Sequence, residues 1–106
     1  MNIKKATEEY FEAFASKDIS RLKEIYSPNV RLVDWLVDLT GRPEVLKANE
    51  ELFKLDFTLE VKSIAWSLLN QSFNYIVITI GDEVLHIMDV ITFKDGKILD
   101  ITAYKR

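Results

Sequence analysis

The chain has 106 residues, of which 48% are apolar and 29% charged, with 14 basic and 17 acidic side chains and a net charge of −3. This length predicts one domain over residues 1–106, and the apolar fraction excludes a disordered chain. A negative charge disfavours a nucleic-acid-binding protein, and no apolar run is long enough to cross a membrane. The chain has no cysteine, which excludes disulfides and thiolate metal sites. No secretory leader is evident, so we expect a cytoplasmic protein.

Three helices are expected in the first half of the chain. Residues 2–16 place apolar side chains at helical spacing among lysines and glutamates. A short second helix follows an N-cap at Asp18 or Ser20, and we expect Pro28 to end it. A third helix is expected to start at Pro43, because a proline N–H would have no partner in the first turn.

Strands are expected elsewhere, first a short one that runs from Val30 into a loop and then four long ones after residue 57. The alternation of apolar side chains changes parity near Ser63, which predicts a β-bulge. Turns are expected at residues 70–72 and at the Asp-Gly pair within 94–97. Helices followed by a strand meander predict an α+β fold, with three N-terminal helices packed on a curved antiparallel sheet.

Three polar residues occur where apolar side chains are expected. Tyr10 lies on the inner face of the first helix, so its hydroxyl needs a partner. The alternative to a functional role is that Tyr10 is an amphipathic core residue. Asp34 ends the first strand and is a candidate functional residue. The alternative is that it is simply solvated at the end of the strand. Asp89 alternates with leucine, isoleucine and phenylalanine, and a carboxylate on such a face is unfavourable unless it is paired or protonated. The alternative for Asp89 is an outward-facing position on a sheet edge.

Other side chains give weaker signals. His86 is the only histidine, and its odd spacing from Asp89 places it on the opposite face of the strand. One histidine and no cysteine disfavour a transition-metal site, so no metal is expected. Glycine-rich nucleotide loops and nucleophile elbows are absent, and no cofactor is expected.

The whole chain resembles the nuclear-transport-factor-2-like (NTF2-like) superfamily, which has a cystatin-like fold, and within it the SnoaL and ketosteroid isomerase branch. The resemblance depends on Tyr10 before Lys17-Asp18-Ile19, Tyr26-Ser27-Pro28-Asn29-Val30 before Val33-Asp34, Gly41, Met88-Asp89-Val90-Ile91-Thr92-Phe93, Gly96-Lys97-Ile98 and Ala103-Tyr104. It implies a cone in which helices cover a curved sheet.

The resemblance also implies three catalytic positions. Asp34 matches the family's general base, Tyr10 its oxyanion donor, and Asp89 its second donor, a protonated aspartic acid. Trp35 departs from the family, where a proline commonly follows the base. Lys105 replaces a bulky aromatic residue, and it could pair with Asp34 or select an anionic substrate.

We therefore expect a cofactor-free isomerase or lyase that moves a proton on a small apolar carbonyl compound. A small-molecule-binding protein that does not turn its ligand over is the alternative. A homodimer through the outer face of the sheet is also expected, with His86, Met88 and Tyr104 near the contact. The predicted substrate-binding residues are Trp35, Phe53, Trp66, Ile87, Ile91, Phe93 and Lys105.

Overall fold

The computed structural model describes residues 1–106 and has the element order α1 (Ile3–Ala15), α2 (Ile19–Ile25), β1 (Tyr26–Val33), β2 (Asp38–Thr40), α3 (Arg42–Phe53), β3 (Phe57–Trp66), β4 (Gln71–Ile80), β5 (Glu83–Lys94) and β6 (Lys97–Lys105). All three predicted helices are present, and the α+β class is confirmed. None of them combines the length and the apolar character that crossing a membrane requires.

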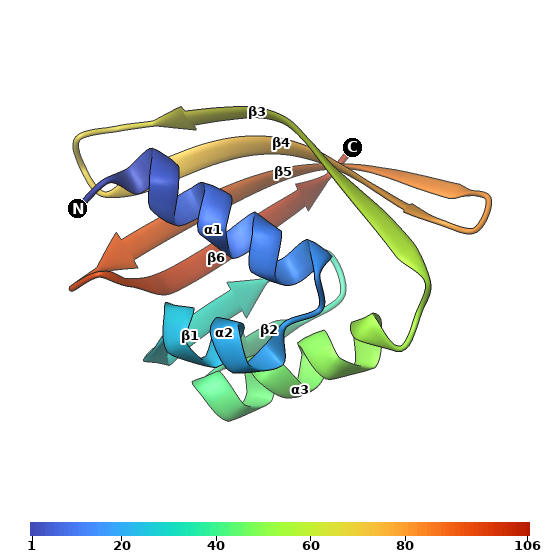
Figure 1. Cartoon of the computed structure of the whole chain (residues 1–106), viewed down its shortest axis with the longest axis horizontal. Coiled ribbons are helices and arrows are strands. Elements are labelled where there is room, and N and C mark those ends of the chain that lie inside the picture. The colour runs from blue at the N-terminus through green and yellow to red at the C-terminus, as the bar shows by residue number, and fades with distance from the viewer.

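The six strands form one curved sheet in the order β2-β1-β6-β5-β4-β3 (Figure 1). Neighbouring strands from β3 to β6 are antiparallel, as predicted, but β1 and β6 pair in parallel. The sheet is therefore mixed rather than wholly antiparallel. This pairing is possible because α3 and four strands separate β1 from β6 in the chain, which leaves ample length for a crossover.

The helices cover one face of the sheet, here called the inner face. The helix α1 packs against β3 and β4, and α3 packs against β1 and β2. Buried apolar side chains from α1, α2, α3 and all the strands except β2 form one core beneath them. The opposite, outer face has no helix over it.

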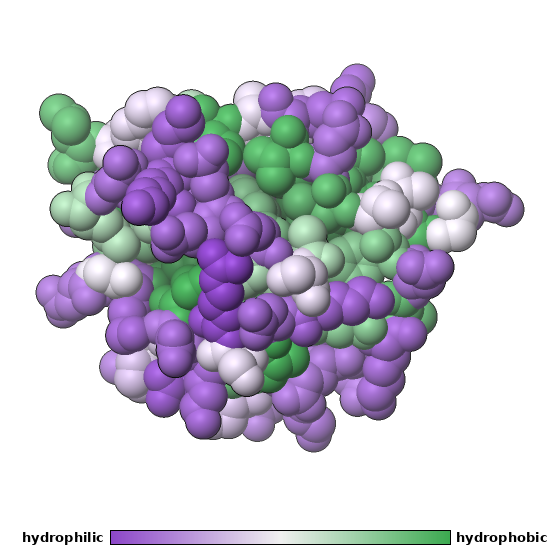
Figure 2. Space-filling model, viewed as in Figure 1, coloured by the Kyte–Doolittle hydropathy of each residue, from purple (hydrophilic) through white to green (hydrophobic).

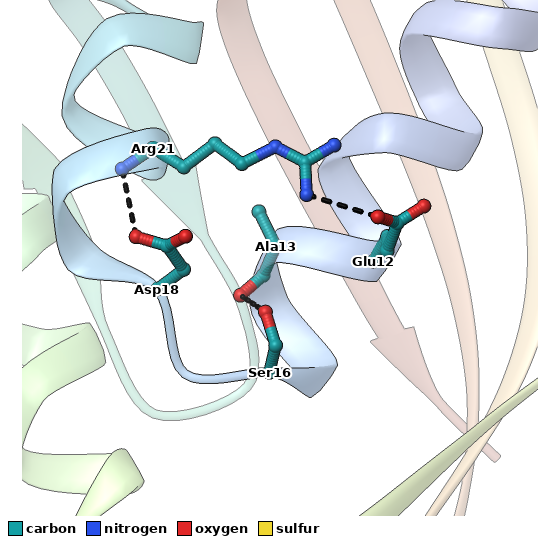
Figure 3. Close-up of polar contacts among 5 residues, drawn as sticks. All are labelled: Glu12, Ala13, Ser16, Asp18 and Arg21. Carbon is teal, nitrogen blue, oxygen red and sulfur yellow. Dashed lines mark hydrogen bonds and ion pairs between the residues drawn. The ribbon is translucent and has the colours of Figure 1, made fainter.

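The junction between α1 and α2 is held by short polar contacts (Figure 3). Asp18 caps α2 by accepting a hydrogen bond from the backbone N–H of Arg21 at 3.1 Å, as one of the two predicted N-caps. Arg21 also forms an exposed ion pair with Glu12, and Ser16 donates to the Ala13 carbonyl. Exposed pairs of this kind contribute little stability, so the Asp18 cap is the contact that starts α2.

Two boundaries differ from the sequence-based expectation. The helix α2 ends at Ile25, and Pro28 lies inside β1. Pro28 is tolerated there because the pairing of β1 with β6 is irregular between Tyr26 and Arg31, where a missing N–H costs no ladder bond. The turn expected at residues 70–72 ends at Asn70, which has a positive φ of 63°, and Gln71 already belongs to β4.

Other local predictions are confirmed. The register between β3 and β4 shifts between Val61 and Ser63, where the change of parity predicts a bulge. Asp95 and Gly96 both have positive φ, as a tight hairpin turn requires. The strand β2 was not predicted; Asp38 on it forms a two-pronged ion pair with Arg31 of β1.

Candidate functional site

A cavity of about 420 Å³ lies between the helices and the inner face of the sheet. Its walls are mainly apolar side chains from α1, α3, every strand except β2, and the loop of residues 34–37. Figure 2 shows apolar surface on this side of the molecule between the polar side chains of the helices and the β4–β5 hairpin. The polar side chains that line the cavity are Tyr10, Tyr26, Asp34, Asn49, Glu83 and Asp89. An apolar cavity with a few convergent polar groups is the usual form of a small-molecule site.

Asp89 lies on β5 with its side chain on the inner face and is only 6% exposed. Its backbone carbonyl accepts a hydrogen bond from Asn74, but its carboxyl group has no hydrogen-bond partner in the protein. Burial, and to a smaller extent the negative charge of Asp34, raises the pKa of Asp89 to about 7. Asp89 can therefore be a neutral carboxylic acid near neutral pH and can donate a hydrogen bond into the cavity.

Tyr10 reaches the same cavity from α1 and is 4% exposed. Its ring packs against Phe11, Phe14 and Tyr26, with centroids 5.1 to 6.2 Å apart. Burial, followed by the neighbouring Tyr26 and Asp89, raises the pKa of Tyr10 well above its usual value. Tyr10 thus keeps its proton, and its hydroxyl is a second donor beside Asp89.

Asp34 lies directly after β1, at the edge of the cavity. Its Oδ1 accepts hydrogen bonds from the backbone N–H groups of Leu36 and Val37, at 2.7 and 2.8 Å. These bonds fold residues 34–37 into a tight loop and fix the orientation of the carboxylate, while Oδ2 receives no hydrogen bond from the protein. Asp34 therefore has one ordered, available oxygen with which it can accept a proton.

Lys105 does not pair with Asp34, which was one of its two expected roles. Its ammonium group lies over the ring of Trp35, 5.3 Å from the ring centroid. Trp35 lines the cavity, whereas Lys105 is exposed and does not. The position of the side chain follows from a cation–π contact, which the strand pattern of β6 does not reveal.

The other predicted wall residues are divided between the cavity and the core. Ile87 lines the cavity, but Phe53, Trp66, Ile91 and Phe93 do not. Alternation predicts correctly that Ile91 and Phe93 face inward, but both lie further along β5 than the cavity extends and are buried in the core. Phe53 packs edge-on against Phe14, with the ring centroids 5.1 Å apart.

Trp66 is the clearest correction among these residues. It lies at the end of β3, is 52% exposed and is covered by the ammonium group of Lys4, 5.8 Å from its ring centroid. Its parity predicts the inner face, but the strand runs past the edge of the core before it reaches this position.

Two polar cavity residues, Tyr26 and Asn49, were not predicted. The Tyr26 hydroxyl donates to Asn49 Oδ1 at 2.7 Å, and burial raises the pKa of Tyr26 well above its usual value. An asparagine between Val45 and Leu52 on the inner face of α3 was the available signal. Glu83 also lines the cavity, but from an exposed position at the start of β5, which a sequence pattern cannot distinguish from solvated surface.

No group of three or more histidine, cysteine or acidic side chains is placed to hold a metal ion. Asp34, Glu83 and Asp89 all line the cavity, but they do not come together as such a group. The arrangement at the cavity can therefore offer proton donors and a proton acceptor from its own side chains.

Comparisons with known proteins agree with this architecture. The structure is similar to a candidate ketosteroid isomerase from Kribbella flavida DSM 17836, with a TM-score of 0.91, 20% identity, and coverage of 98% of this chain and 77% of that one. It is also similar to a steroid delta-isomerase from Pseudomonas aeruginosa, with a TM-score of 0.83, 19% identity and coverage of 99% and 80%. A candidate polyketide cyclase from Sinorhizobium meliloti gives a TM-score of 0.85, 17% identity and 93% coverage of both chains.

These likenesses have low sequence identity and establish the fold. NTF2-like and cystatin-like proteins are also among the similar structures. A search of curated proteins by sequence finds no significant match. The SnoaL-like domain family matches residues 7–101, nearly the whole chain, and this protein therefore belongs to that family.

Proposed function

We propose that the protein catalyses proton transfer of the ketosteroid isomerase type, as an isomerase or lyase that acts on a small apolar carbonyl compound without a cofactor. The observation that supports this most strongly is that Tyr10, Asp34 and Asp89 line one apolar cavity. Asp34 serves as the general base, while Tyr10 and neutral Asp89 donate hydrogen bonds to the substrate oxygen. A base and two donors in one water-poor site are what enolate formation needs.

The reaction begins when Asp34 Oδ2 removes a proton from the carbon next to the carbonyl group. The negative charge that develops on the substrate oxygen is stabilised by the hydroxyl of Tyr10 and the carboxylic proton of Asp89. Hydrogen bonds to such an oxygen strengthen as it becomes charged, so they favour the transition state over the bound substrate. Asp34 then returns the proton to another carbon of the substrate or to a leaving group.

Apolar walls select the class of substrate. No lysine or arginine side chain lines the cavity, whereas three carboxyl groups do, those of Asp34, Glu83 and Asp89. This lining supports a neutral ligand over an anionic one, because an acid bound here would face the acidic side chains of Asp34 and Glu83 without a counter-ion. It argues against the role of Lys105 in selecting an anionic substrate.

The proposal is tested by incubating the protein with a small cyclic enone in deuterated water. Exchange of deuterium into the position next to the carbonyl, measured by NMR or mass spectrometry, supports catalysis when it exceeds the rate without protein. Binding of the enone without any exchange would instead support the non-catalytic binding protein.

Replacing Tyr10 with phenylalanine is expected to lower the exchange rate by about 100-fold, because one donor to the developing oxyanion is lost. The ring and its packing against Phe11 and Phe14 are kept. Tyr75→Phe is the matched control, since its hydroxyl bonds His86 on the outer face and lies away from the cavity. Equal rates in wild type and Tyr10→Phe would remove Tyr10 from the mechanism.

We also propose that two copies of the chain pair through the outer face of the sheet. Phe73, Met88 and Tyr104 are 39 to 60% exposed on adjacent strands of this face, and the register places Met88 beside Tyr104. His86 is on the same face, bonded to Tyr75 at 2.6 Å. Apolar side chains that gather on an uncovered face favour association.

The double variant Met88→Glu/Tyr104→Glu is expected to convert a dimer into a monomer, because buried glutamates would repel across the interface. Sedimentation velocity at micromolar concentration measures the change, with wild type at twice the chain mass of 12.3 kDa. A wild-type protein that sediments at the mass of one chain would refute this assembly and leave the cavity chemistry untouched.

A further inference from the structure

Asn74 Oδ1 is the only polar side-chain atom that is completely closed off from solvent and has no hydrogen-bond partner. Asn74 lies on the inner face of β4, is completely buried, and pairs directly with Asp89 across the β4–β5 ladder. Unsatisfied buried polar atoms are rare in folded proteins because they forgo water without replacing it. Asn74 Oδ1 is therefore expected to accept a hydrogen bond from one of the groups beside it.

A directed chain of hydrogen bonds fixes the orientation of the Asn74 amide. The Thr7 hydroxyl lies 2.8 Å from the Ile3 carbonyl and 2.9 Å from the Ser72 hydroxyl. The Thr7 hydroxyl has a single hydrogen, which it donates to the Ile3 carbonyl because a carbonyl oxygen can only accept. The Ser72 hydroxyl therefore donates to Thr7 Oγ1, and Ser72 Oγ is free to accept. Asn74 Nδ2 then donates to Ser72 Oγ at 3.1 Å and to the Asp89 carbonyl at 3.3 Å. A flipped amide would bring Oδ1 against that carbonyl, where two acceptors would repel.

The group that the strand register places opposite Asn74 and that can supply a proton to its Oδ1 is the carboxyl of Asp89. Side chains directly opposite each other in an antiparallel pair have Cβ atoms about 5 Å apart, within reach of a carboxyl and an amide. The Asp89 carboxyl has no other partner in the protein, and the titratable groups that face it are Tyr10, Tyr26 and Asp34. Both tyrosines retain their protons, and Asp34 is the proposed base.

We infer that Asn74 Oδ1 accepts the carboxylic proton of Asp89 while the cavity is empty, and that Asn74 is thus a positioning residue for this donor. The catalytic consequence depends on the proposed function, whereas the hydrogen bond itself does not. An amide oxygen is a weaker acceptor than an enolate, so the proton turns from Asn74 to the substrate oxygen as charge develops there. Asn74 in this way keeps Asp89 protonated and ready between turnovers.

The test is the titration of Asp89 by carboxyl ¹³C NMR in the ligand-free Asn74→Leu protein. The midpoint is expected to fall by about one pH unit from its wild-type value, because the neutral acid loses its acceptor. The direction is informative, since an added apolar side chain alone would raise the midpoint. Asn74→Val, which also fills the space with apolar atoms, provides the same measurement if the leucine variant does not fold.

Thr92→Val is the matched control, because it removes a partly buried hydroxyl, bonded to Gln71 at 3.1 Å, from the strand that carries Asp89 and leaves the chain of hydrogen bonds that orients Asn74 intact. Its Asp89 midpoint is expected to stay at the wild-type value. An unchanged or raised midpoint in the folded Asn74 variants overturns the inference, and so does an equal fall in Thr92→Val, which would indicate general loosening.

Kinetics separate this inference from the proposed function. If wild type catalyses exchange, the alkaline limb of its pH–rate profile should move to lower pH in Asn74→Leu by the same amount as the NMR midpoint. A shifted midpoint with no exchange by wild type would refute the proposed function and support the role of Asn74. Exchange by wild type with no shift in midpoint would refute only the role of Asn74.

Discussion

Asp34→Asn is expected to slow exchange of the proton next to the carbonyl by about 1,000-fold, within the range that a general base contributes. Asparagine keeps an Oδ1 that can accept the N–H groups of Leu36 and Val37, so the loop of residues 34–37 is retained. It cannot take up the proton, and only the base is removed. The comparison is made on saturating cyclic enone in deuterated water.

The control for this variant is Asp38→Asn on the neighbouring strand β2. Asp38 is exposed and paired with Arg31, so its replacement removes one nearby charge without changing the cavity. Exchange in Asp38→Asn should remain at the wild-type rate. If Asp34→Asn also retains that rate, Asp34 is not the base and the proposed mechanism is wrong.

Wild type is expected to lose stability as the pH rises from about 4 to about 7. Replacing Asp89 with asparagine is expected to remove most of this loss. An unfolded aspartate ionises near pH 3.9, whereas burial holds the folded group protonated up to a pKa of about 7. Between these values the folded state binds more protons than the unfolded state, so stability falls as pH rises and levels off above pH 7. The difference of about three pH units corresponds to no more than about 4 kcal/mol.

Urea unfolding at pH 4 and at pH 8 measures this effect as the change in the free energy of unfolding. Asp89→Asn should gain stability relative to wild type as pH increases, while the control Asp100→Asn, on the outer face of β6, should follow wild type. A constant difference between Asp89→Asn and wild type at both pH values would show that Asp89 titrates as a solvated acid does.

Most of the fold follows from local patterns in the sequence. Helical spacing in residues 3–15, the change of parity near Ser63 and the Asp-Gly turn at Asp95 each have a direct cause in backbone geometry. The parallel pairing of β1 with β6 could not be predicted in this way, because it joins segments far apart in the chain. Pro28 gave a wrong boundary because its effect depends on whether a partner strand needs its N–H.

The site was predictable where the two-residue repeat of a strand determines which face of the sheet a side chain occupies. Asp89 is the example, since alternation gives its face and apolar neighbours give its burial. Alternation does not say how far along a strand a cavity extends, and for this reason Ile91 and Trp66 were misplaced. The Asn74–Asp89 and Tyr26–Asn49 pairs depend on contacts between segments, which only the folded chain brings together.

The most direct test of the account is the titration of Asp89 in wild-type protein, followed by the ¹³C shift of its carboxyl group. We predict a midpoint near pH 7, as expected for a buried acid that remains a neutral donor beside Tyr10. A midpoint near pH 4, as in a free side chain, would leave the cavity without its neutral acid and would contradict the proposed proton transfer.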